Sequence, residues 1–296
     1  MNGSEASAEA ARIDAAVQAV LDVAHDAGLR VNHPRLLRDL TTVVVHLAPE
    51  RVVGRAVSVE SATVDRHTLE RELAVTSFLA EHGAAVAAPV ARIDAGPIER
   101  AGYLVTLWEY VEHDHTRPID GWAAGRRLRE IHELLATADL HGLPHFMRAE
   151  ELTGLLERLR LTGDQSALFE RALAAMGTAL SSYELDLQPV HGDAHLGNVL
   201  RTPNGPVWGD FEKVCLGPRE LDIACNEIRA GALGREPSDD EFLGGYGAFD
   251  AGLVSVLVHI QTLVLAAWTF ALAERRPDFA DVAVQRLRAA AEGLGV

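Results

Sequence analysis

The sequence predicts an α+β protein whose N-terminal part is rich in β-strand and whose C-terminal part is largely helical. β-Branched residues gather between Thr41 and Val111, whereas apolar residues recur at helical spacing from Ile119 onward. The chain has 296 residues, of which 48% are hydrophobic and 24% are charged, as is typical of globular proteins. This length accommodates one large domain or two lobes with cores of their own.

The N-terminal part is predicted to contain two helices and four strands. One helical repeat of apolar residues ends at Gly28 and a second ends at Gly83. β-Branched runs on both sides of Ala48-Pro49-Glu50 indicate a β-hairpin or meander. In chain order, we expect a helix over 5–27, strands over 41–47 and 51–59, a helix over 65–82, and strands over 86–93 and 102–111.

The C-terminal part is predicted to be helical with one short β interruption. Leu128, Ile131 and Leu135 share one face of the first of these helices. The turn Pro203-Asn204-Gly205 separates two short apolar runs and indicates a small hairpin. We expect helices over 122–136, 150–161 and 166–183, strands over 199–201 and 207–209, and helix from 222 to the end.

Composition limits the function classes. The chain has 27 basic and 43 acidic residues, a net charge of −16, and no basic run, so neither a nucleic acid nor a membrane surface is expected as partner. A cationic small molecule would suit this charge. Cys215 and Cys225 are too few for a disulfide framework or a four-cysteine zinc site. The first residues lack a signal-peptide pattern, so we expect a cytoplasmic protein, with the oligomeric state left open.

The segment from Ala251 to Ala273 has no charged residue and is long enough to span a bilayer. It carries His259, Gln261 and Thr262 at its centre, and polar groups at that depth are unfavourable in lipid. We therefore expect a buried helix in the core of the C-terminal part.

The segment His191-Gly192-Asp193-Ala194-His195-Leu196-Gly197-Asn198 places polar side chains in a loop between apolar flanks. Its spacing, His-x-Asp-x-x-x-x-Asn, is that of a kinase catalytic loop, and Asp210 follows twelve residues after Asn198. Phosphoryl transfer needs one carboxylate to accept the proton of the attacking hydroxyl, which suits Asp193. It also needs oxygen ligands for Mg²⁺, which suits Asn198 and Asp210.

This segment, the triplet Asp210-Phe211-Glu212 and the later Leu221-Asp222-Ile223-Ala224 together resemble the aminoglycoside phosphotransferase family, over nearly the whole chain from about residue 35. The resemblance implies a protein-kinase-like bilobal fold, with an N-lobe over 1–107, a hinge over 108–111 and a helical C-lobe over 112–296. It implies ATP or GTP as phosphate donor, Mg²⁺ as cofactor and a small-molecule hydroxyl as acceptor, an aminoglycoside or another antibiotic among them. By motif match, Asp193 is the catalytic base, and Asn198 and Asp210 are the metal ligands.

The kinase arrangement also requires a strand cation that holds the donor phosphates and pairs with a helix carboxylate. Arg55 stands on the predicted strand where kinases have lysine, and Glu72 falls within the apolar stripe of the next helix. A carboxylate on an inward face needs a partner, so we predict an Arg55–Glu72 pair. The phosphate-covering turn, Leu40 to Val43, has no glycine, which leaves Thr41 and Thr42 as weak phosphate contacts.

Four further residues complete the predicted site and its support. The strand Thr106 to Val111 matches the family's hinge, where the backbones of Glu109 and Val111 would bind the purine. His195 stands two residues after Asp193, where protein kinases place a lysine near the transferred phosphate. It either donates to that phosphate or supports the loop. Asp222 is expected to bond the loop backbone as a structural carboxylate.

Two other functions remain open from the residues alone. The His191/Asp193/His195 cluster, joined by Asp210, would also suit a metal-dependent hydrolase with zinc. Arg55 in place of lysine and the glycine-free turn would suit a nucleotide-binding module without catalysis. The identity of the acceptor carries no readable code in the C-terminal helices.

Overall fold

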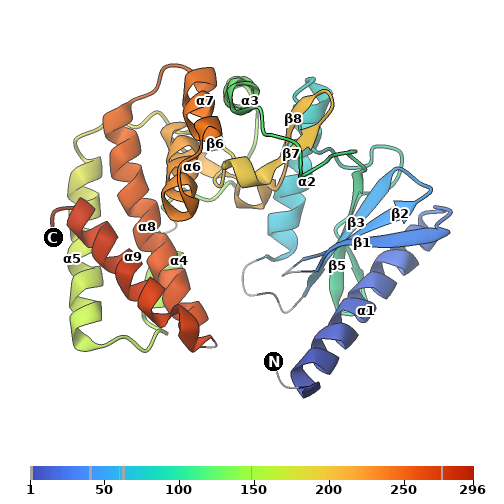
Figure 1. The fold of residues 1–296 in the computed structure, drawn as a ribbon, viewed down its shortest axis with the longest axis horizontal. Helices are drawn as coiled ribbons and strands as arrows, with labels where there is room; N and C mark the ends of the chain where they lie inside the picture. Colours follow the sequence, from blue (N-terminus) through green and yellow to red (C-terminus); the bar gives the residue numbers. More distant parts are fainter. Residues whose placement is uncertain (1–2, 40–41, 60, 62–63, 148, 275) are drawn as a thin grey trace. The chain divides into compact units, whose positions relative to one another are not determined.

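The computed structural model describes residues 3–39, 42–59, 61, 64–147, 149–274 and 276–296 (Figure 1). The chain forms two compact units. The N-terminal unit comprises Met1–Ile119 and Asn198–Lys213, and the C-terminal unit comprises Asp120–Gly197 and Val214–Val296. The first contains the main sheet and the second is mostly helical, which confirms the predicted α+β class. The lobe boundaries and the hinge over 108–111 stay predictions.

The N-terminal unit is built on a five-stranded antiparallel sheet in the order β1-β2-β3-β5-β4. The predicted hairpin and the strand at 102–111 are its centre. Two edge strands, β1 and β4, were not predicted. β1 contains Pro34 and is exposed along its whole length, so it carries no alternating apolar pattern. The strands are β1 (His33–Asp39), β2 (Val43–Ala48), β3 (Val52–Ser58), β4 (Ile98–Arg100) and β5 (Tyr103–Glu109).

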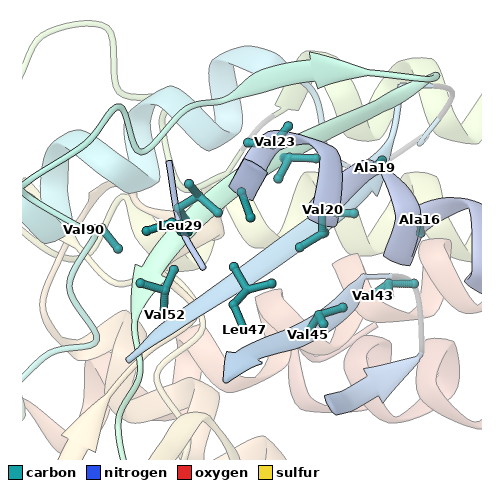
Figure 2. Close-up of a cluster of buried hydrophobic side chains, with 14 residues drawn as sticks. Ala16, Ala19, Val20, Val23, Leu29, Val43, Val45, Leu47, Val52 and Val90 are labelled. Carbon is teal, nitrogen blue, oxygen red and sulfur yellow. The ribbon is translucent and has the colours of Figure 1, made fainter. Parts of the chain in front are cut away.

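Helix α1 (Gly3–Asp26) covers one face of this sheet. Its Ala16, Val20 and Val23 pack on inward side chains of the central strands, as Figure 2 shows. Gly54 of β3 permits this close approach, because a Cβ there would overlap the side chain of Val20. Alternate residues of β3 therefore serve the α1 core.

The intervening residues of β3, which include Arg55 and Val57, point to the opposite face of the sheet. Helix α2 (Arg66–Glu81) covers this face, with Leu69 packed in one buried cluster with Val57 and Leu104. Its first turn is capped by Asp65, whose side chain accepts a hydrogen bond from the Thr68 amide. Strand alternation thus brings the Arg55 side chain to the inner face of α2.

The prediction of a strand over 86–93 is wrong. Its hydrogen bonds are divided between two partners: Ala87 N–H donates to Trp208 O, and Val90 N–H donates to Leu107 O. Only isolated bridges form, at Val86 and Pro89. Because Pro89 has no N–H to donate and the partner changes around it, no continuous ladder can form.

A small hairpin completes the N-terminal unit. It consists of β7 (Val199–Thr202) and β8 (Gly205–Trp208), which pair antiparallel with Val199 opposite Trp208. Short 3₁₀ turns flank it, η1 (Leu196–Asn198) before β7 and η2 (Phe211–Lys213) after β8. The hairpin was predicted from the turn at residues 203–205.

The C-terminal unit packs four of its helices around a buried hydrophobic cluster. Residues of α4, α5, α8 and α9 form one core, which includes Phe169, Leu263 and Leu287. A two-stranded ladder of β6 (Gln188–Val190) and β9 (Cys215–Gly217) precedes α6. The helices are α3 (Gly121–Leu135), α4 (Ala149–Leu156), α5 (Gly163–Leu180), α6 (Glu220–Leu233), α7 (Pro237–Tyr246), α8 (Ala251–Ala273) and α9 (Ala280–Gly293), with the turn η3 (Pro277–Phe279) before α9.

Helices α3 and α7 cross at very close range. A Cβ on Gly121 or Gly125 of α3 would overlap a carbonyl oxygen of α7, and a Cβ on Gly245 of α7 would overlap the carbonyl of Trp122. Only glycine at these positions lets the two backbones approach this closely. The crossing fixes where the polar side chains of α7 lie.

Helix α8 is the uncharged segment noted in the sequence. Among the residues that the structure describes, it alone has the length and apolar composition of a membrane span, and the core helices of soluble proteins share these properties. Leu263, Ala266 and Ala267 on one face are fully buried in the core cluster, as predicted. Trp268 and Leu272 on its other face are exposed.

Candidate active site

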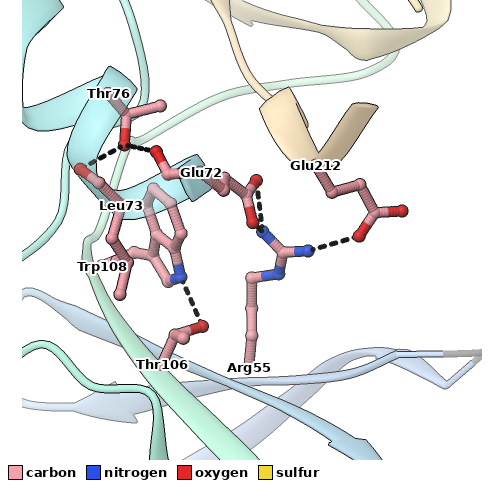
Figure 3. A network of polar contacts seen from close by, with 7 residues as sticks. All are labelled: Arg55, Glu72, Leu73, Thr76, Thr106, Trp108 and Glu212. Atoms are coloured by element: carbon pink, nitrogen blue, oxygen red, sulfur yellow. Dashed lines mark hydrogen bonds and ion pairs between the residues drawn. The ribbon is translucent and has the colours of Figure 1, made fainter. Parts of the chain in front are cut away.

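The predicted Arg55–Glu72 pair is present (Figure 3). Arg55 Nη1 donates to both carboxylate oxygens of Glu72, at 2.9 and 3.0 Å. The Glu72 side chain is 1% exposed and that of Arg55 is 15% exposed, so this is a buried pair. Trp108 lies beside it, with its ring centre 5.4 Å from the guanidinium carbon. Inward placement of Glu72 on α2 follows from the apolar stripe that surrounds it.

Arg55 has a second carboxylate partner, Glu212 of η2, which sequence reasoning missed. Arg55 Nη2 donates to Glu212 Oε2 at 3.3 Å. Burial would lower the pKa of Arg55, but the carboxylates of Glu72, Asp210 and Glu212 raise it well above its usual value. Burial and the neighbouring Asp210 raise the pKa of Glu212 to about 7, against the opposing charge of Arg55. The forked guanidinium thus holds two carboxylates from different elements.

Asn198 and Asp210 lie at the same open end of the β7–β8 hairpin. The Val199–Trp208 register places Asn198 opposite Gly209, and the Gly209 amide donates to Asn198 O at 3.0 Å. Asp210 follows directly with a φ of 67°, in the left-handed region that non-glycine residues rarely adopt. Such local strain at a polar residue is common at functional sites.

The chemistry of this hairpin end fits a magnesium ion. Asp210 Oδ1 is buried and has no hydrogen-bond partner, which is costly for a carboxylate oxygen unless a cation binds there. An amide oxygen from Asn198 and a carboxylate from Asp210 are hard ligands, and Mg²⁺ in such sites takes its remaining ligands from phosphates and water. We therefore find that these residues suit the predicted metal.

The zinc cluster required by the hydrolase hypothesis is not formed. Within the described part of the chain, no three or more His, Cys, Asp or Glu side chains come together as a metal site. His195 Nε2 and Asp193 Oδ1 are 4.0 Å apart. The hydrolase interpretation therefore lacks its metal centre.

One backbone group of each predicted hinge residue is already hydrogen-bonded. Glu109 N–H donates to Ala88 O at 2.8 Å, and Val111 O accepts from the His113 ring at 2.8 Å. Binding of a purine edge would then fall to the carbonyl of Glu109 and the amide of Val111. Of the two threonines in the phosphate-covering turn, Thr41 lies outside the described residues.

The predicted catalytic loop belongs to the C-terminal unit from His191 to Gly197, whereas Asn198 belongs to the N-terminal unit. Its Asp193 and His195 are partly exposed, with the His195 ring turned toward the carboxylate. Gly197 N–H donates to His195 Nδ1 at 3.1 Å, so the proton of the neutral ring sits on Nε2, the nitrogen that faces Asp193. The His195 ring thus accepts from the loop backbone through Nδ1 and faces the Asp193 carboxylate with Nε2.

Asp222 bonds the loop backbone, as expected. Its oxygens accept from His191 N–H at 2.8 Å and Gly192 N–H at 2.7 Å. His132 Nε2 donates to the same carboxylate at 2.7 Å, and His132 Nδ1 forms a 2.8 Å hydrogen bond with the Tyr246 hydroxyl. Burial raises the pKa of Asp222, but hydrogen bonds and the charges of nearby histidines outweigh it and lower the pKa below its usual value. The buried carboxylate thus stays ionised and holds the start of the loop.

The structural class defined by these features is a protein-kinase-like fold. An amicoumacin kinase bound to AMP-PNP, Ca²⁺ and its antibiotic superposes with a TM-score of 0.73, 17% identity, and coverage of 92% of this chain and 93% of that chain. A choline kinase from Streptococcus pneumoniae superposes with a TM-score of 0.69 and 15% identity, and the match covers 94% of this chain and 98% of that chain. A spectinomycin phosphotransferase bound to ADP and spectinomycin superposes with a TM-score of 0.61 and 14% identity, and the match covers 94% of this chain and 97% of that chain.

The sequence also matches the phosphotransferase enzyme family over residues 39–255. This match spans most of the chain, and the protein belongs to that family. The predicted resemblance and the predicted enzyme class, a small-molecule kinase, are confirmed. Comparison with curated protein sequences gives no match.

Proposed function

We propose that the protein transfers the terminal phosphate of Mg-ATP, or of Mg-GTP, to a hydroxyl group of a small cationic molecule. The observation that carries this proposal is the buried Asp210 Oδ1 without a partner, next to Asn198 at the end of the β7–β8 hairpin. Family membership supports the reaction class. Dependence on a nucleoside triphosphate also favours the predicted cytoplasmic location.

Asn198 and Asp210 would hold Mg²⁺, and Arg55 would contact the donor phosphates. Bound Mg²⁺ would neutralise charge on the phosphate oxygens during transfer. The hydrogen bonds of Arg55 to Glu72 and Glu212 use two of its nitrogens, whereas a guanidinium offers five N–H donors. Donors therefore remain for phosphate while the carboxylates fix the orientation of the group.

Asp193 would accept the proton of the acceptor hydroxyl as its oxygen bonds to the terminal phosphorus. The bond from that phosphorus to the bridging oxygen breaks, and the nucleoside diphosphate leaves. His195 Nε2 lies 4.0 Å from Asp193 Oδ1, on the side that faces the carboxylate. Glu109 and Val111 would bind the purine through their backbones.

The acceptor class follows from charge. A chain with a net charge of −16 favours a cationic acceptor over an anionic one. Structural neighbours of this fold are described as kinases of choline, ethanolamine, aminopropanol and the antibiotics amicoumacin and spectinomycin. Amino alcohols and aminated antibiotics are therefore the acceptors to test, and antibiotic resistance is one physiological role among several.

The test is a product-mass screen. Purified protein is incubated with Mg-ATP or Mg-GTP and, in turn, choline, ethanolamine, aminopropanol, amicoumacin, spectinomycin and an aminoglycoside. We expect a mass increase of one phosphate on at least one acceptor. Asp193→Asn should lower that turnover by about 10²–10⁴-fold, the usual contribution of a general base.

Asp139→Asn serves as the control, because Asp139 is an exposed aspartate of the C-terminal unit. It should leave turnover unchanged. Turnover by Asp193→Asn at the wild-type rate would refute the proposed base. Mg-dependent nucleotide binding, with neither a phosphorylated product nor ATP hydrolysis above that of Asp210→Ala, would instead support a non-catalytic module.

A further inference from the structure

We propose that Asn226 of α6 is a positioning residue for the loop that carries Asp193, an inference that rests on the proposed function. Asp222 and Asn226 lie one helical turn apart on α6, so their side chains share one face. Asp222 holds the start of the loop through His191 and Gly192. Asn226 holds its other end.

The second attachment is a hydrogen bond from Leu196 N–H to Asn226 Oδ1 at 3.1 Å. On its other side, Asn226 Nδ2 donates to Asp239 Oδ1 of α7 at 3.3 Å. The two contacts fix one orientation of the Asn226 amide. Leu196 N–H needs the amide oxygen as acceptor, and the Asp239 carboxylate needs the amide nitrogen as donor. The Asn226 side chain is fully buried, so water does not replace either contact.

Asp239 is committed to this contact and is not an acceptor-binding carboxylate. It is 1% exposed, and its second oxygen accepts the Glu236 N–H at 2.9 Å in the first turn of α7. Helix α7 thus supports both attachments: Asp239 orients Asn226, and Tyr246 orients the histidine that bonds Asp222. The close α3–α7 crossing keeps these side chains in place.

Asp193 lies between the two attachments, after Gly192 at a φ of 80°. Neither Asp222 nor Asn226 needs to touch the reacting atoms to set the position of the carboxylate. A displacement of about 1 Å in a catalytic group can lower a rate by about 10²-fold. Loss of the second attachment should therefore affect turnover more than binding of nucleotide.

The test exchanges the two side chains. Asn226→Asp keeps the acceptor for Leu196 N–H but sets two carboxylates against each other. Asp239→Asn alone leaves one acceptor oxygen where there were two, so either Asn226 Nδ2 or Glu236 N–H loses its partner. The double variant N226D/D239N restores every hydrogen bond with the donor on the opposite side. Asn204→Asp, in the exposed turn of the β7–β8 hairpin, adds the same charge as a control.

Two readouts are used for each variant. Hydrogen exchange of the peptide 190–198, followed by mass spectrometry, reports loop order without any substrate. ADP release from Mg-ATP with the acceptor panel described above reports kcat and KM. We expect N226D to lower kcat at least about tenfold, with KM for ATP changed less than about threefold, and to speed loop exchange. The double variant should recover most of both values.

The inference is overturned if N226D folds with unchanged kcat and loop exchange, or if the double variant is folded but as impaired as N226D. If N226D does not fold, the double variant alone decides, because it must fold and turn over near the wild-type rate. Failure of the proposed function gives a different pattern. Asp193→Asn would then keep its turnover, or no acceptor would react, while the exchange rescue in the double variant would still be seen.

Discussion

Replacing Glu72 by glutamine should destabilise the N-terminal unit by about 1.5–3 kcal/mol. Breaking a buried ion pair by removing one partner costs about 3–5 kcal/mol, and a hydrogen bond to a charged group contributes about 1.5–3 kcal/mol. Here the lower range applies for two reasons. The amide oxygen of glutamine still accepts from Arg55 Nη1, and Glu212, 3.3 Å from Nη2, remains as a second hydrogen-bond partner.

Urea unfolding followed by tryptophan fluorescence measures this loss. The chain has four tryptophans, and a W122F/W268F background retains Trp108 and Trp208, which both belong to the N-terminal unit. Trp108 stands next to the guanidinium of Arg55, so its emission reports the affected region. Each variant is compared within this background, because two units can unfold in separate steps.

Glu70→Gln is the matched control on the same helix. The Glu70 side chain is 48% exposed and pairs with the exposed His67, so its replacement should change the free energy of unfolding by less than about 0.5 kcal/mol. The reasoning is refuted if Glu72→Gln and Glu70→Gln have equal effects. That result would mean that Arg55 is adequately balanced without its buried partner.

Gly125→Ala should destabilise the C-terminal unit by about 1–3 kcal/mol, since its Cβ would overlap the Phe242 carbonyl and lie 2.7 Å from the Tyr246 nitrogen. Gly177→Ala, a helical glycine with open space around its Cβ, should instead stabilise by about 0.5–1 kcal/mol in the same thermal unfolding assay. In metal-free protein, the Glu212 pKa is raised from 4.5 to about 7, so the folded state retains a proton that the unfolded chain has released. This group should therefore make the free energy of unfolding fall as pH rises from 4.5 to 7, and Glu212→Gln should reduce that slope; an unchanged slope contradicts the assignment. Asp210→Asn should abolish the rise in melting temperature that Mg-ATP produces, while the metal-free variant is at least as stable as wild type; retained Mg²⁺ dependence would exclude Asp210 as a ligand.

The site residues that sequence could predict are those whose positions follow from a local pattern. Glu72 was found because a carboxylate within an apolar helical stripe must have a buried partner, and strand alternation made Arg55 that partner. Asn198 and Asp210 were predicted from their spacing, and the hairpin register places them at one end of the hairpin. In each case, one element or one hairpin contains the whole signal.

The residues that sequence missed depend on contacts between elements far apart in the chain. Nothing local distinguishes Asn226 from any polar residue of an amphipathic helix, since its role needs the packing of α6 against α7. Asp239 reads as a first-turn acidic residue, yet it is buried. Strand β1 was missed for another reason, because a fully exposed edge strand that contains Pro34 has no apolar periodicity to detect.

Arg55 stands where kinases usually have lysine, and the neighbouring Glu212 gives a structural reason for an arginine at this position. A lysine ammonium is a compact point charge that Glu72 alone could balance, whereas the planar fork of arginine presents its second branch in a fixed direction. In this chain that branch meets Glu212, two residues after Asp210. Arg55 is therefore held from α2 and from the turn beside the proposed metal ligand. This double attachment favours a nucleotide-binding role for Arg55, because a cation fixed on both branches has less freedom to lose when phosphate binds.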